Sequence, residues 1–114
     1  MPKLLNLGCG SHYSTAPGWV NVDMAASPGV IGHNLYNPLP FEDNRFDVVY
    51  HSDVIEHLHK RSVPLFLREC MRVLRPGGVL RVAAPDLEAV ASLYLGMLRG
   101  ALTGDMECRK RYEW

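Results

Sequence analysis

The sequence predicts an α/β fold built on a parallel sheet, and three observations indicate it. Short apolar runs alternate with segments whose apolar residues recur every three or four positions, which is typical of strands joined by crossover helices. The first apolar run stops at two glycines in LLNLGCG, as a strand does where its backbone must come close to a ligand. The length of 114 residues, with 47% hydrophobic and 21% charged residues, is that of one globular domain at most.

Five short runs have the composition of strands. They are Lys3–Leu7, Trp19–Asp23, Val30–Leu35, Arg45–Ser52 and Gly77–Pro85. The connection between the first two strands is about ten residues long, close to the minimum for a crossover. It contains Pro17 and Gly18, so we expect a loop or a single turn there in place of a helix.

Two segments are predicted to be helices. From Ser62 to Leu74 the apolar residues share one helical face, and Pro76-Gly77-Gly78 is expected to end this helix. The second helix is predicted from Leu87 to Leu98, with Asp86 as its N-cap. A polar segment follows, so we expect a domain over residues 1–98 and a polar tail, or the start of a further region, over 99–114.

Composition argues against several classes of protein. Twelve basic residues balance twelve acidic residues, which disfavours a nucleic-acid-binding protein. Cys9, Cys70 and Cys108 are far apart, without the spacing of metal ligands, so we expect free thiols in a reducing compartment and no metal site. No stretch has the length of a membrane span or the form of a signal peptide, and we expect a cytoplasmic protein.

Gly8 and Gly10 are the first candidate site residues, because glycine leaves no Cβ between backbone and ligand. A glycine pair also occurs in plain tight turns. Asp23 strengthens the ligand interpretation, since a carboxylate at the end of the second strand can accept both hydroxyls of a ribose. Tyr13 occupies the place of the third glycine of the dinucleotide motif, which favours a phosphate-free nucleoside over NAD.

Four segments carry a resemblance to a known family. LNLGCG, GWVNVD, PLPFEDNRFDVVYHSDVIEHL and ECMRVLRPGGVLRVAAPDLE, from about Lys3 to Glu88, resemble class I S-adenosylmethionine-dependent methyltransferases, in particular a small bacterial type. The resemblance implies a Rossmann-like sheet. The family sheet has the order 3-2-1-4-5-7-6, so the five strands expected here would have the order 3-2-1-4-5, truncated after the fifth.

The resemblance also implies S-adenosylmethionine as cofactor and a role for each matching residue. The backbone of Gly8, Cys9 and Gly10 would pass under the methionine part, and Ser52 would line the same side. Asp23 would bind the ribose. The adenine would lie against Met24, and Asn34-Leu35 would stand near its amine, where asparagine keeps a carbonyl acceptor but lacks the charge of the usual acid.

His57 is the best candidate for a general base, should one be needed, because it follows the fourth strand and histidine has a suitable pKa. Its alternative role is to cap or pack the start of a helix. Asp53 and His51 are weaker candidates for the base. Cys9 is interpreted as a small packing residue between the glycines and not as a nucleophile.

The leading hypothesis is therefore a methyltransferase that acts on a small molecule or sugar, with no nucleic acid and no membrane as partner. A non-catalytic module that binds S-adenosylmethionine or its demethylated product, or a fragment of a longer methyltransferase, is the alternative. A domain that binds NAD or another nucleotide is disfavoured by Tyr13. The fifth strand would be an open edge, which a homodimer partner, a further region or the tail could cover.

Overall fold

The computed structural model of the chain describes residues 1–104. Contacts divide the chain into two units, Met1–Ala84 and Pro85–Trp114. The first unit contains β1 (Leu4–Leu7), β2 (Trp19–Asp23), β3 (Val30–Gly32), β4 (Phe46–Ser52), a single 3-10 turn (Ile55–His57), α1 (Val63–Val73) and β5 (Leu74–Ala83), and the second contains α2 (Leu87–Leu102). No helix among residues 1–104 is long and apolar enough to cross a membrane.

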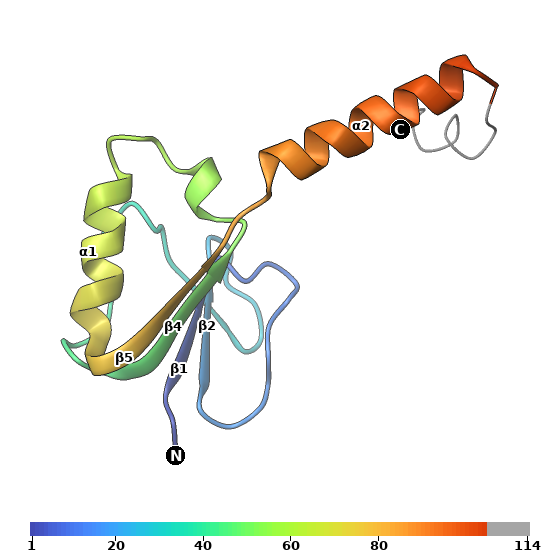
Figure 1. The fold of residues 1–114 in the computed structure, drawn as a ribbon. Coiled ribbons are helices and arrows are strands. Elements are labelled where there is room, and N and C mark those ends of the chain that lie inside the picture. Colours follow the sequence, from blue (N-terminus) through green and yellow to red (C-terminus); the bar gives the residue numbers. More distant parts are fainter. Residues whose placement is uncertain (105–114) are drawn as a thin grey trace. The chain divides into compact units, whose positions relative to one another are not determined.

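The strands of the first unit form one parallel sheet in the order β3-β2-β1-β4-β5 (Figure 1). The predicted fold class and strand order are therefore confirmed. The connection from β1 to β2 consists of turns and bends without a helix, as its length predicts. In Figure 1, α1 lies on one side of the sheet and this irregular connection runs on the other.

The core lies between the sheet and α1. Alternate residues of a strand face opposite sides, so Leu5, Leu7 and Val49 point together toward the helix. They belong to one cluster of buried side chains with Phe66 and Cys70 of α1. Burying each such Leu, Val or Phe side chain contributes about 1.5–3 kcal/mol. This packing fixes the carboxyl ends of β1 and β4 next to each other.

The predicted bounds of several elements are wrong. The fifth strand runs from Leu74 to Ala83 and not from Gly77 to Pro85. The third strand ends at Gly32 and does not extend to Leu35. Pro76-Gly77-Gly78 does not end the helix, because α1 stops at Val73 and these residues lie within β5. The physical reason is Pro76, whose ring disfavours helical backbone at Arg75. The chain is extended at Leu74, and β5 then has a register irregularity against β4, where Gly77 has a φ of 78°.

In the second unit, α2 begins as predicted. The Asp86 carboxylate accepts the backbone N–H of Ala89 at 3.2 Å, which is an N-cap contact. The helix continues to Leu102, past the predicted end at Leu98, and has no buried residue. The predicted division into residues 1–98 and 99–114 stays a prediction. Residues 105–114, which include Cys108, lie outside the described residues.

His51 of β4 is buried in the core without a polar partner. Its side chain is 0% exposed, and its ring lies edge-on to the Phe66 ring with the centroids 5.1 Å apart. Neither ring nitrogen has a hydrogen-bond partner among the described residues. Burial lowers the pKa of the imidazole, and the charge of Glu56 opposes this effect. The core therefore holds His51 in its neutral form.

Replacing His51 by leucine is expected to reduce the pH dependence of stability. Because the folded-state pKa lies below the ordinary 6.5, the unfolded chain binds protons more readily in acid. The contribution of His51 is thus present above pH 6.5 and is lost as the pH falls from there through the folded-state pKa. His51→Leu removes the pH-dependent contribution of the imidazole and also its two unpaired buried nitrogens. The unfolding free energy near pH 6 should therefore rise by about 1 kcal/mol. Urea unfolding of both proteins between about pH 5 and 7.5 measures the effect, and parallel pH profiles would contradict it.

Candidate functional site

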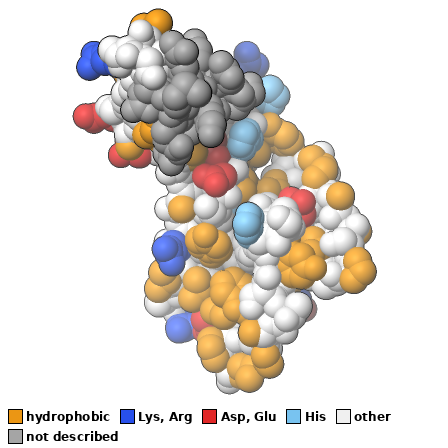
Figure 2. All heavy atoms as spheres, turned by 90° about the vertical axis from the view of Figure 1, so that its right-hand side faces the viewer, with side chains coloured by type: hydrophobic (Ala, Val, Ile, Leu, Met, Phe, Trp, Pro, Cys, Tyr) orange, Lys and Arg blue, Asp and Glu red, His pale blue; other side chains and the backbone are white. Residues whose placement is uncertain are grey.

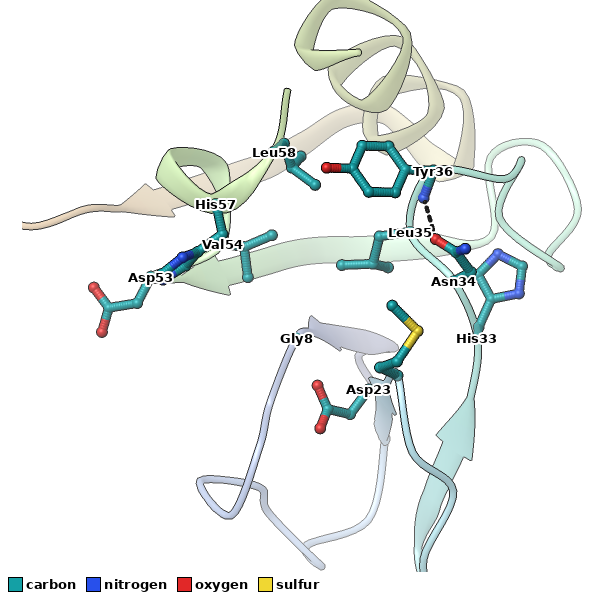
Figure 3. A pocket seen from close by; sticks show the side chains of 11 residues that line it. Gly8, Asp23, His33, Asn34, Leu35, Tyr36, Asp53, Val54, His57 and Leu58 are labelled. Atoms are coloured by element: carbon teal, nitrogen blue, oxygen red, sulfur yellow. Dashed lines mark hydrogen bonds between the residues drawn. The ribbon is translucent and has the colours of Figure 1, made fainter. Parts of the chain in front are cut away.

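Two adjoining pockets open at the carboxyl ends of β1, β2 and β4. We call the first the Met24 pocket, with a volume of about 250 Å³ (Figure 3). It is lined by Gly8, Asp23, Met24, His33, Asn34, Leu35, Tyr36, Asp53, Val54, His57 and Leu58. The second, the Tyr50 pocket, has a volume of about 440 Å³ and is lined by Asn6, Gly8, Cys9, Gly10, His12, Tyr50, Ser52 and Asp53. Gly8 and Asp53 line both pockets, which therefore meet at the ends of β1 and β4.

Gly8 allows the chain to turn at the end of β1 while remaining packed against the segment after β4. Its φ of 63° lies in the left-handed region, and a Cβ there would overlap the Val54 side chain. Gly10 has a φ of 53°, but a Cβ on it would meet nothing within 4 Å. Backbone conformation thus requires glycine at both positions, and close packing requires it in addition at Gly8.

Cys9 lies between the glycines and is 6% exposed. Its backbone N–H donates to the Val22 carbonyl at 3.1 Å, which ties the turn to β2. Burial raises the pKa of the Cys9 thiol, and the nearby Asp23 carboxylate raises it further. The thiol therefore stays protonated near neutral pH, in agreement with a packing role.

Asp23 ends β2 and directs its carboxylate to the Met24 pocket, below Gly8 in the view of Figure 3. The carboxylate forms no hydrogen bond or ion pair with any described residue. The next residue, Met24, is 66% exposed on the pocket wall. An unpaired acceptor thus stands beside an apolar surface, which is what a ligand with hydroxyl groups and a flat ring requires.

The segment after β3 forms the opposite wall of the Met24 pocket. The Asn34 side-chain oxygen accepts the backbone N–H of Tyr36 at 3.0 Å (Figure 3), so this oxygen already shapes the loop. The Asn34 amide nitrogen has no partner among the described residues. The Tyr36 hydroxyl accepts the backbone N–H of His59 at 3.1 Å and joins this wall to the segment after β4.

Asp53 follows the end of β4 with a φ of 57°, a left-handed conformation that is uncommon outside glycine, although aspartate adopts it more often than most residues do. Its backbone N–H donates to the Ala83 carbonyl at 2.9 Å, which holds it there. Left-handed backbone at such a residue costs about 1–3 kcal/mol and is found mainly where function requires it. Asp53 lines both pockets and lies where they meet.

The histidines are placed differently from one another. His57 ends the 3-10 turn on the rim of the Met24 pocket, with its side chain 77% exposed and its Nε2 3.5 Å from the Glu56 carboxylate. His12 lines the Tyr50 pocket. His51 lines neither pocket and is fully buried beneath α1, so it cannot contact a ligand there. Within the described residues, no group of three His, Cys, Asp or Glu side chains could hold a metal ion.

Apart from His51, each residue that the sequence indicated for the site lines at least one of the two pockets. The Met24 pocket is lined by Gly8, Asp23, Met24, Asn34, Leu35 and His57 of this set, and the Tyr50 pocket is lined by Gly8, Cys9, Gly10 and Ser52. Their individual roles stay predictions. The sequence analysis missed Tyr36, Val54 and Asn6. Of these, Asn6 had a signal, because a polar residue interrupts the apolar run of the first strand.

Known proteins resemble this chain in sequence and fold. It is 46% identical over 56 residues to a probable S-adenosylmethionine-dependent methyltransferase of Mycolicibacterium smegmatis, a match that covers 49% of this chain and 21% of that protein. It is 33% identical over 82 residues to a ubiquinone biosynthesis O-methyltransferase of Rhizobium etli, covering 72% of this chain and 29% of that protein. The match thus spans less than a third of either curated relative.

Among solved structures, the PH0226 protein of Pyrococcus horikoshii superposes with a TM-score of 0.64 at 25% identity, over 87% of this chain and 54% of that one. A family model described as a methyltransferase domain matches residues 5–82. This range contains the ends of β1, β2 and β4 and every residue that lines the two pockets. On this match, which covers well over half of its length, the chain belongs to the methyltransferase domain family.

Proposed function

We propose that this protein is an S-adenosylmethionine-dependent methyltransferase whose cofactor lies across the Met24 and Tyr50 pockets. The observation that carries the proposal is the unpaired Asp23 carboxylate at the end of β2, beside the bare backbone of Gly8. Membership of the methyltransferase domain family supports it, as do the names of the relatives in Mycolicibacterium smegmatis and Rhizobium etli.

The residues of both pockets fit such a cofactor. A nucleoside needs an acceptor for its ribose hydroxyls and apolar contacts for its ring, and Asp23, Met24 and Leu35 offer these in one pocket. The amino-acid part needs polar backbone and side-chain groups, which Gly10 and Ser52 offer in the other. No helix begins in the connection after β1, so the glycines lack the helix N-terminus that favours phosphate. A phosphate-free ligand therefore fits better than a dinucleotide.

We assign the residues as follows. Asp23 would accept the ribose hydroxyls, and Met24 and Leu35 would provide apolar contacts for the adenine. Asn34 keeps its oxygen on the Tyr36 N–H and presents its free amide nitrogen to a ring acceptor. The backbone from Gly8 through Cys9 to Gly10, with Ser52, surrounds the methionine part.

When bound, the cofactor supplies a methyl group on positively charged sulfur that is already activated for transfer. The chain then has to hold the acceptor in line and keep water away. We assign His57 as the group that takes a proton from the acceptor at Nε2. The Glu56 carboxylate, 3.5 Å from that atom, would stabilise the positive charge that the ring acquires.

We propose a small molecule or sugar as acceptor, on the basis of the Rhizobium etli relative, which is named for ubiquinone biosynthesis. On the face that Figure 2 shows, the basic side chains form no continuous patch. This arrangement supports a partner other than nucleic acid. Cys9 and Cys70 are free thiols, which supports a reducing, cytoplasmic site of action.

Asp23→Ala is expected to weaken binding of S-adenosylhomocysteine by about 10- to 100-fold, because hydrogen bonds to a charged group are lost. Calorimetric titration of both proteins with S-adenosylhomocysteine, S-adenosylmethionine and NAD measures this. Glu42→Ala, which removes an exposed carboxylate outside both pockets, is the matched control and should bind like the unmodified protein. Saturable binding of NAD alone would overturn the proposal.

A second assay separates an enzyme from a module that only binds the cofactor. The unmodified protein should transfer methyl groups from S-adenosylmethionine to at least one small-molecule or sugar acceptor, and His57→Ala should reduce turnover more than it reduces cofactor affinity. Binding of cofactor without turnover would favour the module.

β5 is an outer strand of the described sheet, and its open edge is a place where a partner could bind. β5 has no neighbour on one side, and Val79 and Val82 are 57% and 43% exposed. A second copy, a further region or the tail could cover this edge. Sedimentation equilibrium distinguishes a second copy from the other two by mass.

A further inference from the structure

Two asparagines lie next to each other in the middle of the sheet, on the face opposite α1. Asn6 of β1 and Asn21 of β2 are register partners in the parallel pair, and they are 6% and 4% exposed. Leu5 and Leu7, which flank Asn6, point into the core, so Asn6 points the other way. A buried amide costs free energy unless it is hydrogen-bonded, and its partners therefore indicate what it is for.

Both amide nitrogens donate to the backbone of the connection between β1 and β2. Asn6 Nδ2 donates to the His12 carbonyl at 3.1 Å, and Asn21 Nδ2 donates to the Ser14 carbonyl at 2.9 Å. Asn6 Nδ2 also lies 3.5 Å from Asn21 Oδ1, a long contact that orients the two amides relative to each other. The pair therefore presents two donors to two alternate carbonyls of the same segment.

The other hydrogen bonds of this segment are local. The His12 N–H donates to the Cys9 carbonyl, and the Ser14 hydroxyl accepts the N–H of Ala16. Among the described residues, the two asparagine contacts are thus the hydrogen bonds that join residues 12–14 to the sheet. A crossover helix would satisfy its carbonyls internally, whereas this short connection has to find partners elsewhere.

We propose that Asn6 and Asn21 are positioning residues that hold the connection in the shape that receives the cofactor, in place of a first crossover helix. The inference rests on the proposed function. The connection supplies Gly10 and His12 to the Tyr50 pocket, so its position sets one wall of that pocket. Asn21 lines neither the Met24 nor the Tyr50 pocket and acts on them only through the connection.

Asn21→Asp tests the proposal, because the two side chains have the same shape. An ionised carboxyl cannot donate to the Ser14 carbonyl, whereas a protonated carboxyl can. We expect binding of S-adenosylhomocysteine at about pH 7.5 to be roughly tenfold weaker in the variant. The difference in affinity between the variant and the unmodified protein, measured at the same pH, should become smaller as the pH is lowered toward about 5, because the carboxyl then takes up a proton. Calorimetric titration across this range, with circular dichroism to verify folding, provides the measurement.

Val49→Ala is the control for general destabilisation, since Val49 lies in the core, 0% exposed, and lines neither pocket. It should lower the unfolding free energy without a pH-dependent change in affinity. If Asn21→Asp does not fold, Asn21→Ala replaces it, with amide hydrogen exchange as the readout. Exchange should then quicken at residues 11–16 while the amides of β4 keep their protection.

The outcomes separate the two proposals. Weaker, pH-dependent binding with faster exchange at residues 11–16 supports the positioning role. Unchanged affinity and unchanged exchange in both Asn21 variants overturn it, even where the unmodified protein binds S-adenosylhomocysteine. Absence of binding by the unmodified protein contradicts the proposed function and with it the cofactor part of this inference. In that case, amide hydrogen exchange at residues 11–16 still measures whether the side chains of Asn6 and Asn21 hold the connection between β1 and β2.

Discussion

Gly8→Ala is expected to lose about 2–5 kcal/mol of unfolding free energy and most of its affinity for S-adenosylhomocysteine. Two independent costs add. Alanine in the left-handed region, where Gly8 has a φ of 63°, costs about 1–2 kcal/mol. The new methyl group would also overlap the Val54 side chain, and forced overpacking costs about 1–3 kcal/mol. Val54 is 7% exposed and belongs to the core cluster, so it cannot simply move away.

Two further variants separate these costs. Gly10→Ala meets the same backbone penalty, with a φ of 53°, but its methyl group would enter open space. It should lose only about 1–2 kcal/mol. The double variant Gly8→Ala/Val54→Ala relieves the overlap and should bind better than Gly8→Ala. Urea unfolding and calorimetry on the four proteins measure these effects, and equal losses at Gly8 and Gly10 would refute the role given to Val54.

The strands were predictable because their signal is local. Each apolar run ends at glycine, proline or a polar residue, and burial on both faces makes a parallel strand nearly continuous in apolar residues. The absence of a helix after β1 followed from the length of the connection and from Pro17 and Gly18 within it. Strand order was not available from any run of residues. It came from the resemblance of four segments to a family, because residues that are neighbours in the sheet, such as Leu5 of β1 and Val49 of β4, are far apart in the sequence.

What the sequence did not predict depends on contacts between distant residues. Val54 lies in a segment without helical or strand periodicity, and its importance arises only because it packs where a side chain on Gly8 would be. The left-handed backbone of Asp53 has no signature in its residue type beyond a modest preference. The Asn34 oxygen, which the resemblance places near the adenine amine, also accepts the Tyr36 N–H at 3.0 Å. The residue type alone did not indicate this turn contact.

Arg72 of α1 joins the helix to the long segment before β4. Its guanidinium donates to the Leu39 carbonyl at 2.9 Å, the Phe41 carbonyl at 2.8 Å and the Asp43 carboxylate at 2.8 Å. It also pairs with Glu69 one turn earlier, through Nε to Oε2 at 2.8 Å and through Nη2 to Oε1 at 3.0 Å. These are five donors in the fork geometry that only arginine offers, so the residue satisfies two backbone carbonyls and two carboxylates at once.

Arg72→Ala is expected to lower the unfolding free energy by about 3 kcal/mol, a value reduced from the sum of its contacts because the side chain is 31% exposed. Arg72→Lys should recover less than half, since an ammonium cannot reach all of these acceptors. Urea unfolding at neutral pH measures both variants. A lysine variant as stable as the unmodified protein would show that charge alone, and not the fork, holds the segment.

The pH dependence of the same variants provides an independent test. Hydrogen bonds from Arg72 are the main cause of the lowered pKa of Glu69, and the Leu39 N–H, at 2.7 Å, lowers it further. A carboxyl whose pKa is lowered on folding stabilises the protein above its ordinary value of 4.5, and this contribution is lost as the pH falls through the folded-state pKa. Without Arg72 the shift is smaller, so Arg72→Ala should lose less stability than the unmodified protein between pH 6 and about pH 3. If the unfolding free energy of both proteins falls equally steeply in acid, other carboxyl groups cause the fall. Asp47 is one such group, because the Lys3 N–H and Arg75 lower its pKa.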